Sequence, residues 1–349
     1  GFLQAYLRRF AEMMLSVALF FLVVNTVRSE ERLRRVVRVV LLGSFASALV
    51  GVALYIVADQ ISSDFVIRAL SALGRIGYPS GPGVLRYIRE NPELPMRATS
   101  TSVDPNVLGS LLNVTIAISV PQLFVRRPLI QRRYLVPMLG VMTLCLGLTM
   151  SRGSMVGLGA ALVIMGTLRY RKLWGLLAGA LALMLLLPQT QALVTHFLEG
   201  FMVEDLATQM RMGEYKDALT LIGRYPLLGV GFAGSPDVDT YIGVANLYLL
   251  IAEEMGLVGL TSFLVIMGAL FVRFWRTRRL AAGSELESLY WGLHGGLVGA
   301  LTGGVFDHYF FNLDFHHSVT VFWLVVGLAT VATELVRKAS SSDLDARPG

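Results

Sequence analysis

The sequence predicts an all-α protein, a polytopic bundle of about nine transmembrane helices with a large non-cytoplasmic loop that contains an amphipathic helix. Hydrophobic residues make up 54% of the chain and charged residues only 15%, whereas a soluble domain carries about 25% charge. Backbone groups cannot stay unpaired in lipid, so each membrane-crossing segment is expected to be a helix. Clusters of arginine separate the hydrophobic segments at regular intervals, which indicates repeated crossing of the membrane.

Nine hydrophobic segments come close to the roughly 20 residues that cross a bilayer core. The fifth and sixth are the short ones. The expected spans are 10–27, 36–58, 105–124, 134–150, 154–168, 173–187, 244–272, 288–304 and 318–336.

Basic residues occupy every second loop, which predicts that these loops face the cytoplasm. The basic clusters lie at 28–38, 126–133, 169–172, 273–279 and 337–338. Loops 59–104, 188–243 and 305–317 are then expected on the non-cytoplasmic side, together with the N-terminus.

The chain begins with Gly1 and shows no signal peptide, so we expect one or more preceding helices; a translocated N-terminus is the alternative. Residues 1–337 are expected to form a membrane domain and residues 338–349 a disordered cytoplasmic tail.

Several function classes find no support in the sequence. It contains no Walker motif, no dinucleotide-binding glycine motif, no zinc-ligand spacing and no nucleic-acid module. The single cysteine, Cys145, cannot form an intrachain disulfide. We therefore expect no cofactor, no metal and no nucleic-acid partner. Glycines spaced by four in 153–157 and 292–303 predict close packing of two of the helices.

Two arginines mark the outer ends of expected spans. Arg97 precedes a Thr/Ser-rich run that leads to Asp104-Pro105-Asn106, where Asp104 can cap the next helix. Arg152 lies in the tight turn Ser151-Arg-Gly-Ser between two hydrophobic segments. The plain interpretations are a loop with a helix cap, and an arginine that extends from a helix end to the lipid headgroups. Ionisable residues at such positions are also candidates for function.

The segment 207–260 carries the most information. Residues 206–224 are expected to form a helix with Arg211, Tyr215, Ala218 and Ile222 on one face and Glu214 elsewhere. The turn Pro226-Leu-Leu-Gly-Val-Gly231 follows, and then a hydrophobic helix that opens at Asn246 and contains Glu253 and Glu254. A membrane-surface helix whose arginine meets a lipid phosphate is the alternative for the first part.

Taken together, Ser151-Arg152-Gly153, Arg211, the Pro226–Gly231 turn and Asn246 to Glu254 resemble the O-antigen ligase and O-antigen polymerase superfamily of membrane glycosyltransferases. The resemblance implies transfer of a glycan from a polyprenyl-diphosphate carrier to a hydroxyl of a glycan or lipid acceptor, at the outer face of a bacterial cytoplasmic membrane. It also implies roles for individual residues: catalytic for Arg152, Arg211, Asn246 and Glu254, and substrate-binding for Arg97, Tyr215, Pro226, Gly229 and Gly231. Membrane lipids are the remaining expected partners.

The chain departs from the family pattern at Ala245, where the family has a histidine that is its proposed general base. A methyl group cannot accept a proton, so three readings stay open: a base from elsewhere, a non-catalytic lipid-linked-glycan binder on the same scaffold, or a histidine replaced on purpose. His308, His316 and His317 in loop 305–317 are the candidate replacements, ahead of Glu254. A transporter is a third function class, without support from paired broken helices.

Overall fold

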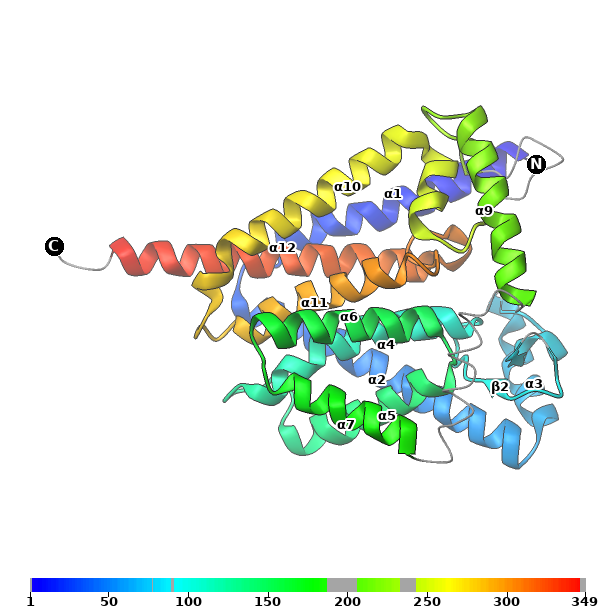
Figure 1. Ribbon diagram of the computed structural model, residues 1–349, viewed down its shortest axis with the longest axis horizontal. Helices are drawn as coiled ribbons and strands as arrows, with labels where there is room; N and C mark the ends of the chain where they lie inside the picture. The colour runs from blue at the N-terminus through cyan, green and yellow to red at the C-terminus, as the bar shows by residue number, and fades with distance from the viewer. Residues whose placement is uncertain (1, 77, 89–90, 187–205, 233–242, 346–349) are drawn as a thin grey trace.

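The computed structural model describes the chain except for residues 1, 77, 89–90, 187–205, 233–242 and 346–349. Nearly all regular structure in the described residues is helical (Figure 1). Each expected span coincides with a helix, which confirms the all-α prediction. These helices are α1 (Phe2–Thr26), α2 (Glu30–Gln60), α4 (Pro105–Ser119), α5 (Arg132–Leu148), α6 (Arg152–Leu168), α7 (Leu173–Leu186), α10 (Leu247–Ala281), α11 (Glu287–Gly303) and α12 (His316–Asp345).

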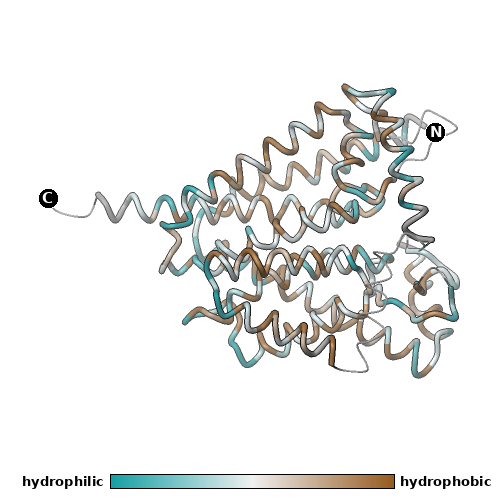
Figure 2. The backbone as a smooth tube through the Cα atoms, in the orientation of Figure 1, coloured by the Kyte–Doolittle hydropathy of each residue, from teal (hydrophilic) through white to brown (hydrophobic). Residues whose placement is uncertain are grey.

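Four of the described helices are long and apolar enough to cross a membrane by length and composition: Glu30–Gln60, Pro105–Phe124, Leu247–Ala281 and Leu313–Ser341. Apolar residues occupy the middle of the long helices and polar residues gather near their ends (Figure 2). The chain is therefore an integral membrane protein, and the number of nine spans stays a prediction. α12 extends as far as Asp345, so part of the expected tail 338–349 is helical. The division of the chain into a membrane domain and a tail stays a prediction.

Helices α4, α6 and α11 form the centre of the bundle, and glycines allow them to approach closely. A Cβ atom on Gly157 of α6 would lie 2.6 Å from Asn113 Nδ2 of α4, and one on Gly299 of α11 would lie 2.5 Å from Asn113 Oδ1. On α11, a Cβ on Gly292 would meet Ile118 O at 2.7 Å. The prediction of close glycine packing is thus confirmed.

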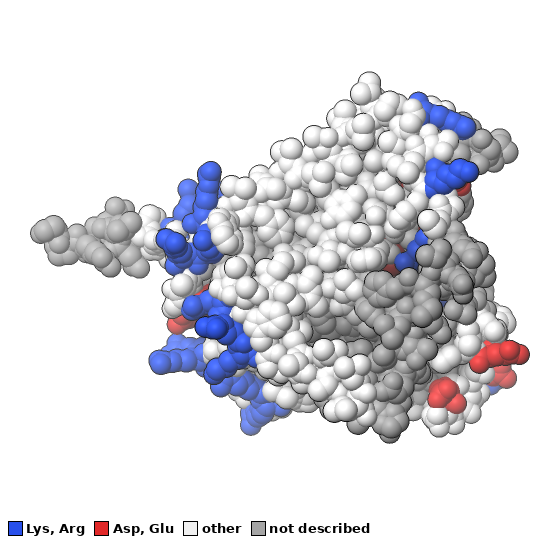
Figure 3. Space-filling view, viewed as in Figure 1, with Lys and Arg blue, Asp and Glu red and all other residues white. Residues whose placement is uncertain are grey.

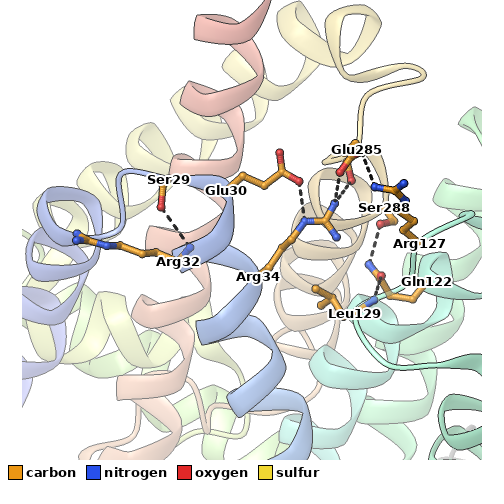
Figure 4. A network of polar contacts seen from close by, with 9 residues as sticks. All are labelled: Ser29, Glu30, Arg32, Arg34, Gln122, Arg127, Leu129, Glu285 and Ser288. Carbon is orange, nitrogen blue, oxygen red and sulfur yellow. Dashed lines mark hydrogen bonds and ion pairs between the residues drawn. The ribbon is translucent and has the colours of Figure 1, made fainter.

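One end of the bundle carries the basic clusters, and we call it the basic end. Lys and Arg side chains gather there on the visible face (Figure 3). In the close view of Figure 4, Arg34 of α2 donates to Glu30 Oε1 at 2.6 Å and to Glu285 O at 2.8 Å. The Glu285 carboxylate lies 3.5 Å from Arg34 Nη2 and 3.9 Å from Arg127 Nη1. The loops between spans are therefore joined to one another by paired charges.

The opposite end carries the remaining elements, and we call it the site end (Figure 1). There α9 runs across the ends of the long helices, beside α3 and a two-stranded hairpin. In the hairpin Arg86 pairs with Arg97 in an antiparallel register. The elements at this end are α3 (Ser63–Ser71), η1 (Ala72–Ile76), η2 (Pro82–Val84), β1 (Arg86–Tyr87), β2 (Met96–Arg97), α9 (Leu206–Arg224) and η6 (Leu313–Phe315).

α10 is broken one third of the way along its length, which the continuous span expected over 244–272 did not include. Gly256 has φ 67° and ψ −175°, so the helical hydrogen-bond ladder stops there and restarts. Glycine adopts this conformation without the steric cost that a Cβ atom imposes. α10 thus consists of a short first part next to α9 and a longer second part that reaches the basic end.

The turn Pro226–Gly231 fills this break with its own backbone. Val230 N donates to Glu253 O at 2.8 Å and Gly231 N donates to Glu254 O at 2.9 Å. In the other direction, Leu257 N donates to Pro226 O at 2.8 Å. The groups that the break releases are therefore paired again, as a low-dielectric environment requires. Gly229 in the turn has φ 66° and Gly256 in the helix has φ 67°. The contact between the turn and the helix therefore depends on a glycine on each side.

We predict that Gly256→Ala lowers stability by about 2 kcal/mol or more, because it adds strain at a positive φ to a steric clash. The new Cβ would lie 2.5 Å from Leu228 N, against backbone that cannot move without losing the turn. Thermal unfolding of the purified protein in detergent measures the effect.

Gly268→Ala on the same helix is the matched control, since nothing lies within 4 Å of its Cβ position. It is expected to leave stability unchanged or raise it by up to about 1 kcal/mol. Equal melting midpoints for the two variants would contradict the role of Gly256.

Candidate functional site

Asp104 starts the candidate site by capping α4, as the sequence predicts. Its Oδ1 accepts from Asn106 N at 2.7 Å and from Val107 N at 3.3 Å, and Pro105 takes the first helical position. The cap holds the Asn106 side chain at the site end. The hydroxyl of Tyr309, from the loop after α11, is in hydrogen-bonding contact with Asp104 and Asn106. The Asp104 carboxylate thus both caps α4 and belongs to a polar cluster with Asn106 and Tyr309.

Arg97 is fixed by two hydrogen bonds. Its Nε donates to Thr149 O at 2.8 Å, and its Nη2 donates to Asn106 Oδ1 at 2.5 Å. Ala98 N also donates to Leu148 O at 2.9 Å. The end of β2 therefore runs beside the turn between α5 and α6, and this places Arg97 next to the start of α6.

The segments around these contacts have strained backbone. Among the described residues, three that are not glycine have positive φ: Ser100 at 52°, Val103 at 68° and Met150 at 51°. A positive φ is unusual for any side chain and most unusual for a β-branched residue such as Val103. All three lie between Arg97 and Arg152 or directly beside them, and stored strain of this kind concentrates at functional sites.

Arg152 is the first residue of α6. Gly153 allows this helix end to approach the loop after α11, because its Cβ position lies 3.0 Å from Phe306 Cβ. Gly109 allows α4 to approach the same helix end, because its Cβ position lies 2.8 Å from Ser154 Oγ of α6. Arg152 thus lies where α4, α6 and the 304–312 loop meet, and it interacts electrostatically with Arg97.

α9 occupies the expected residues 206–224, and its inward face is centred on the fully buried Ala218 and Leu221. Arg211 and Tyr215 are half-buried on this side, as predicted. The expectation that Glu214 lies elsewhere is wrong, because its Oε2 accepts from Ala245 N at 3.1 Å. The helix is positioned by Ala218 and Leu221, and this rotates Glu214 inward as well.

The loop 304–312 completes the cluster and is tied to the start of α10. Leu247 N donates to Gly304 O at 2.7 Å and to Asp307 O at 3.0 Å. Asn246 caps α10 with its Oδ1 and donates from Nδ2 to Val305 O at 2.9 Å. Both polar atoms of Asn246 therefore hold backbone, and its catalytic role stays a prediction.

Electrostatic interactions connect Arg97 and Arg211 through Asp307, and they connect Arg152 to Arg97. Arg211 interacts further with His308. The arginines that the sequence singled out separately are therefore neighbours at the site end, brought there by α6, α9 and the hairpin.

Removal from water shifts the pKa of several of these groups. Burial raises the pKa of Asp307 to about 7, and Asp104 adds to the rise, while the His308 N–H and the arginines oppose it. Burial lowers the pKa of His308 to about 4, against the effect of its hydrogen bond to Val244. Burial also lowers the pKa of Arg97. Near neutral pH the imidazole is uncharged, and Asp307 is divided between its two forms.

His308 lies beside position 245, where the family has its histidine. Its Nδ1 is 2.9 Å from Val244 O, and a carbonyl only accepts, so Nδ1 carries the proton. Nε2 is then an acceptor, and it has no partner among the described residues. A neutral imidazole with one nitrogen fixed and the other available has the arrangement of a general base.

His316 and His317 start α12 and contact each other and Phe315. Within the described chain, no hydrogen bond, ion pair or ring contact joins them to the arginines. Of the three candidate histidines, the structure brings only His308 to the cluster.

Glu253 and Glu254 are buried beside the break in α10. Glu253 faces the backbone of Gly243 and Val244, but neither of its oxygens forms a hydrogen bond of good geometry within the described chain. Glu254 interacts electrostatically with Arg9, Glu253 and Asp314, and not with Arg97, Arg152 or Arg211 among the interactions of the described residues. The contacts of Glu254 do not support its expected catalytic role, which stays a prediction.

The remaining expected binding residues have structural contacts. Tyr215 packs against the main hydrophobic core. Pro226, Gly229 and Gly231 brace the break in α10. The described residues contain no group of three or more His, Cys, Asp or Glu side chains arranged to hold a metal ion.

The sequence groups Asp307 with the loop histidines and does not place it beside the arginines, and it does not single out Tyr309 or Glu214 as members of the cluster. Asp307 and Tyr309 stand in a loop of mixed aromatic and charged residues, and only their position one residue on either side of His308 was a signal. Helical spacing alone does not predict the inward position of Glu214, because it does not show how far a polar helix is rotated about its axis.

Two comparisons with known proteins bear on this arrangement. The O-Antigen ligase family model matches residues 137–264, a range that includes Arg152, Arg211, the Pro226–Gly231 turn and the broken first part of α10. Arg97 and the 304–312 loop lie outside the match. No curated protein matches the chain. The matched range coincides with the motifs that carry the resemblance, so residues 137–264 are similar to the O-Antigen ligase family.

Proposed function

We propose that the protein transfers a glycan from a polyprenyl-diphosphate carrier to an acceptor hydroxyl, as part of cell-surface polysaccharide assembly. The family supports polysaccharide assembly in general terms. The observation that carries this proposal is the arginine cluster at one end of the bundle: Arg97 and Arg211 interact with Asp307, and Arg152 interacts with Arg97.

Guanidinium groups suit a diphosphate because they bind phosphate oxygens in pairs and keep their charge. In the reaction, the bond between the sugar carbon and the diphosphate oxygen breaks, and the negative charge on the leaving diphosphate grows. Arginines fixed beforehand stabilise that charge without rearrangement. Arg97 is fixed in this way by Thr149 and Asn106.

The acceptor hydroxyl must lose its proton as its oxygen attacks the sugar carbon. We assign this proton to Nε2 of His308, which lies beside position 245 and interacts with Arg211. Glu214 is the second candidate base beside position 245, because its carboxylate accepts a hydrogen bond from Ala245 N. His308 ranks first because its available nitrogen is not already engaged.

The alternative is a lipid-linked-glycan binder without transfer activity. It is favoured by one observation, the methyl group of Ala245 where the family has an imidazole. The arginine cluster serves binding in either case, so the two functions differ only in the presence of a competent base.

We infer that the site end faces the non-cytoplasmic side of a bacterial cytoplasmic membrane. Paired arginines gather at the opposite, basic end, and basic loops are retained in the cytoplasm. The carrier-linked donor is then expected to approach from the outer leaflet.

This orientation predicts that cysteines at positions 228 and 276 react from opposite sides. Leu228 is 75% exposed in the turn at the site end, and Arg276 lies near the basic end of α10. On a background of Cys145→Ala, which removes the buried native thiol, a membrane-impermeant maleimide added to intact cells should label Leu228→Cys only. Arg276→Cys should react only after the membrane is opened, and equal labelling of both in intact cells would contradict the orientation.

A glycan-transfer assay tests the base. We expect His308→Gln to lower transfer by about 100-fold or more, the range attributed to general base catalysis, while donor binding stays near that of the unaltered chain. Ala245→His should restore transfer in the His308→Gln background, because it supplies an imidazole at the adjacent position.

The outcomes separate the two proposed functions. No transfer by the unaltered chain, with transfer on Ala245→His, shows a binder on a competent scaffold. If His308→Gln transfers glycan as well as the unaltered chain and Glu214→Gln does not, the general base is Glu214 of α9. Melting midpoints of all variants exclude misfolding as the cause.

Donor affinity should fall as pH rises through about 7. The carboxylate form of Asp307 competes with the donor phosphates for Arg97 and Arg211, and burial raises the pKa of Asp307 to about 7. Below this pH the protonated form leaves both arginines to the donor. The loss is at most about tenfold per pH unit. Asp307→Asn should remove the dependence, and a pH profile unchanged by that substitution would contradict it.

A further inference from the structure

A groove runs between α1, α10 and α12 on the half of the bundle near the basic end. Its volume is about 210 Å³, and its walls include Phe20 of α1, Ile266 and Leu270 of α10 and Val326 of α12. It lies far along α10 from the break at Gly256 and shares no residue with the arginine cluster. The groove is thus separate from the candidate functional site.

The walls of the groove are apolar, including its two threonines. Thr330 Oγ1 donates to Val326 O at 2.9 Å, and Thr333 Oγ1 donates to Ala329 O at 3.0 Å. Each hydroxyl is therefore satisfied within α12. A groove of this kind in the hydrocarbon region cannot stay empty without losing van der Waals contact along its walls. The occupant that the surroundings supply is a hydrocarbon chain.

Arg273 also lines the groove, and of the α10 residues that do so it lies nearest the basic end. Arg273 pairs with Glu334, and Glu334 also pairs with Arg337 at 2.8 Å. Two cations thus share one carboxylate, which leaves a net positive charge at the rim. This end lies at headgroup depth, because Trp275 is close by in the chain with the Arg278 guanidinium 3.5 Å above its ring. Tryptophan is enriched at that level of a membrane.

We propose that the groove binds an anionic phospholipid, with one acyl chain between α1, α10 and α12 and the phosphate at Arg273 and Arg337. The apolar walls match the chain, and the net positive rim matches the headgroup. The bound lipid joins three helices that come from distant parts of the sequence. The proposal does not depend on glycan transfer.

Retention of lipid through purification tests the groove. The protein is purified in mild detergent with added phosphatidylglycerol or phosphatidylcholine and analysed by native mass spectrometry. We expect one retained phosphatidylglycerol on the unaltered chain and none on Ala269→Trp, whose indole fills the groove. Val265→Trp is the matched control, because Val265 lies on the same helix and is 64% exposed. It should retain the lipid.

The rim has its own test. Arg273→Ala should weaken phosphatidylglycerol binding about fivefold, the contribution of one arginine near an anionic surface. Arg35→Ala is the matched control, since Arg35 lies near the same end and pairs only with Glu31 at 2.7 Å among the described residues. It should leave binding unchanged.

Equal retention by Ala269→Trp and Val265→Trp would overturn the groove as the site. Equal binding of the two lipids, together with no effect of Arg273→Ala, would overturn the anionic headgroup. If Ala269→Trp fails to fold, Thr330→Trp fills the same groove from α12 and gives the same comparison.

Discussion

The backbone contact between the Pro226–Gly231 turn and the break in α10 is the constraint on which the site end depends. A broken helix in a membrane leaves carbonyl and amide groups without partners, and each costs several kcal/mol in hydrocarbon. The turn supplies donors to Glu253 O and Glu254 O and an acceptor to Leu257 N. It can come this close because Gly229 and Gly256 have no side chain in the contact. The turn, which the sequence marks only as a motif, therefore completes the hydrogen bonding of the broken helix.

This contact positions the rest of the site. The turn follows directly after α9, so anchoring it in α10 fixes the C-terminal end of α9 across the ends of the bundle. Glu214 then reaches Ala245 N, and Arg211 reaches Asp307 and His308. The short first half of α10 is held in turn by Asn246 and Leu247, which bind the backbone of the 304–312 loop. Three segments that are distant in sequence thus become one rigid arrangement of charges.

The two ends of the bundle use charge differently. At the basic end, arginines pair with Glu285 of the α10–α11 loop and with Glu287, the first residue of α11, and these pairs join neighbouring connections of the bundle. At the site end, the half-buried Arg97 and Arg211 share Asp307, Arg97 also interacts with Asp104, and Arg152 lies beside Arg97. An arginine cluster with too few fully ionised carboxylates attracts an anion. The same residue type therefore joins loops at one end and, at the other, forms the cluster that we propose holds the donor diphosphate.

The sequence by itself determined the positions of the helices, because hydrophobic length and helix caps are local properties. Asp104 and Asn246 cap the helices they precede, and 206–224 is a helix as its pattern indicated. The motifs around Arg152 and Arg211 likewise pointed to the family. Tertiary structure alone decided which of His308, His316 and His317 meets the arginines, how α9 is rotated, and that α10 is broken. These depend on contacts between segments tens to hundreds of residues apart, such as His308 with Val244 and the turn with Gly256. No local pattern of residues encodes such contacts, because they arise only when the helices pack.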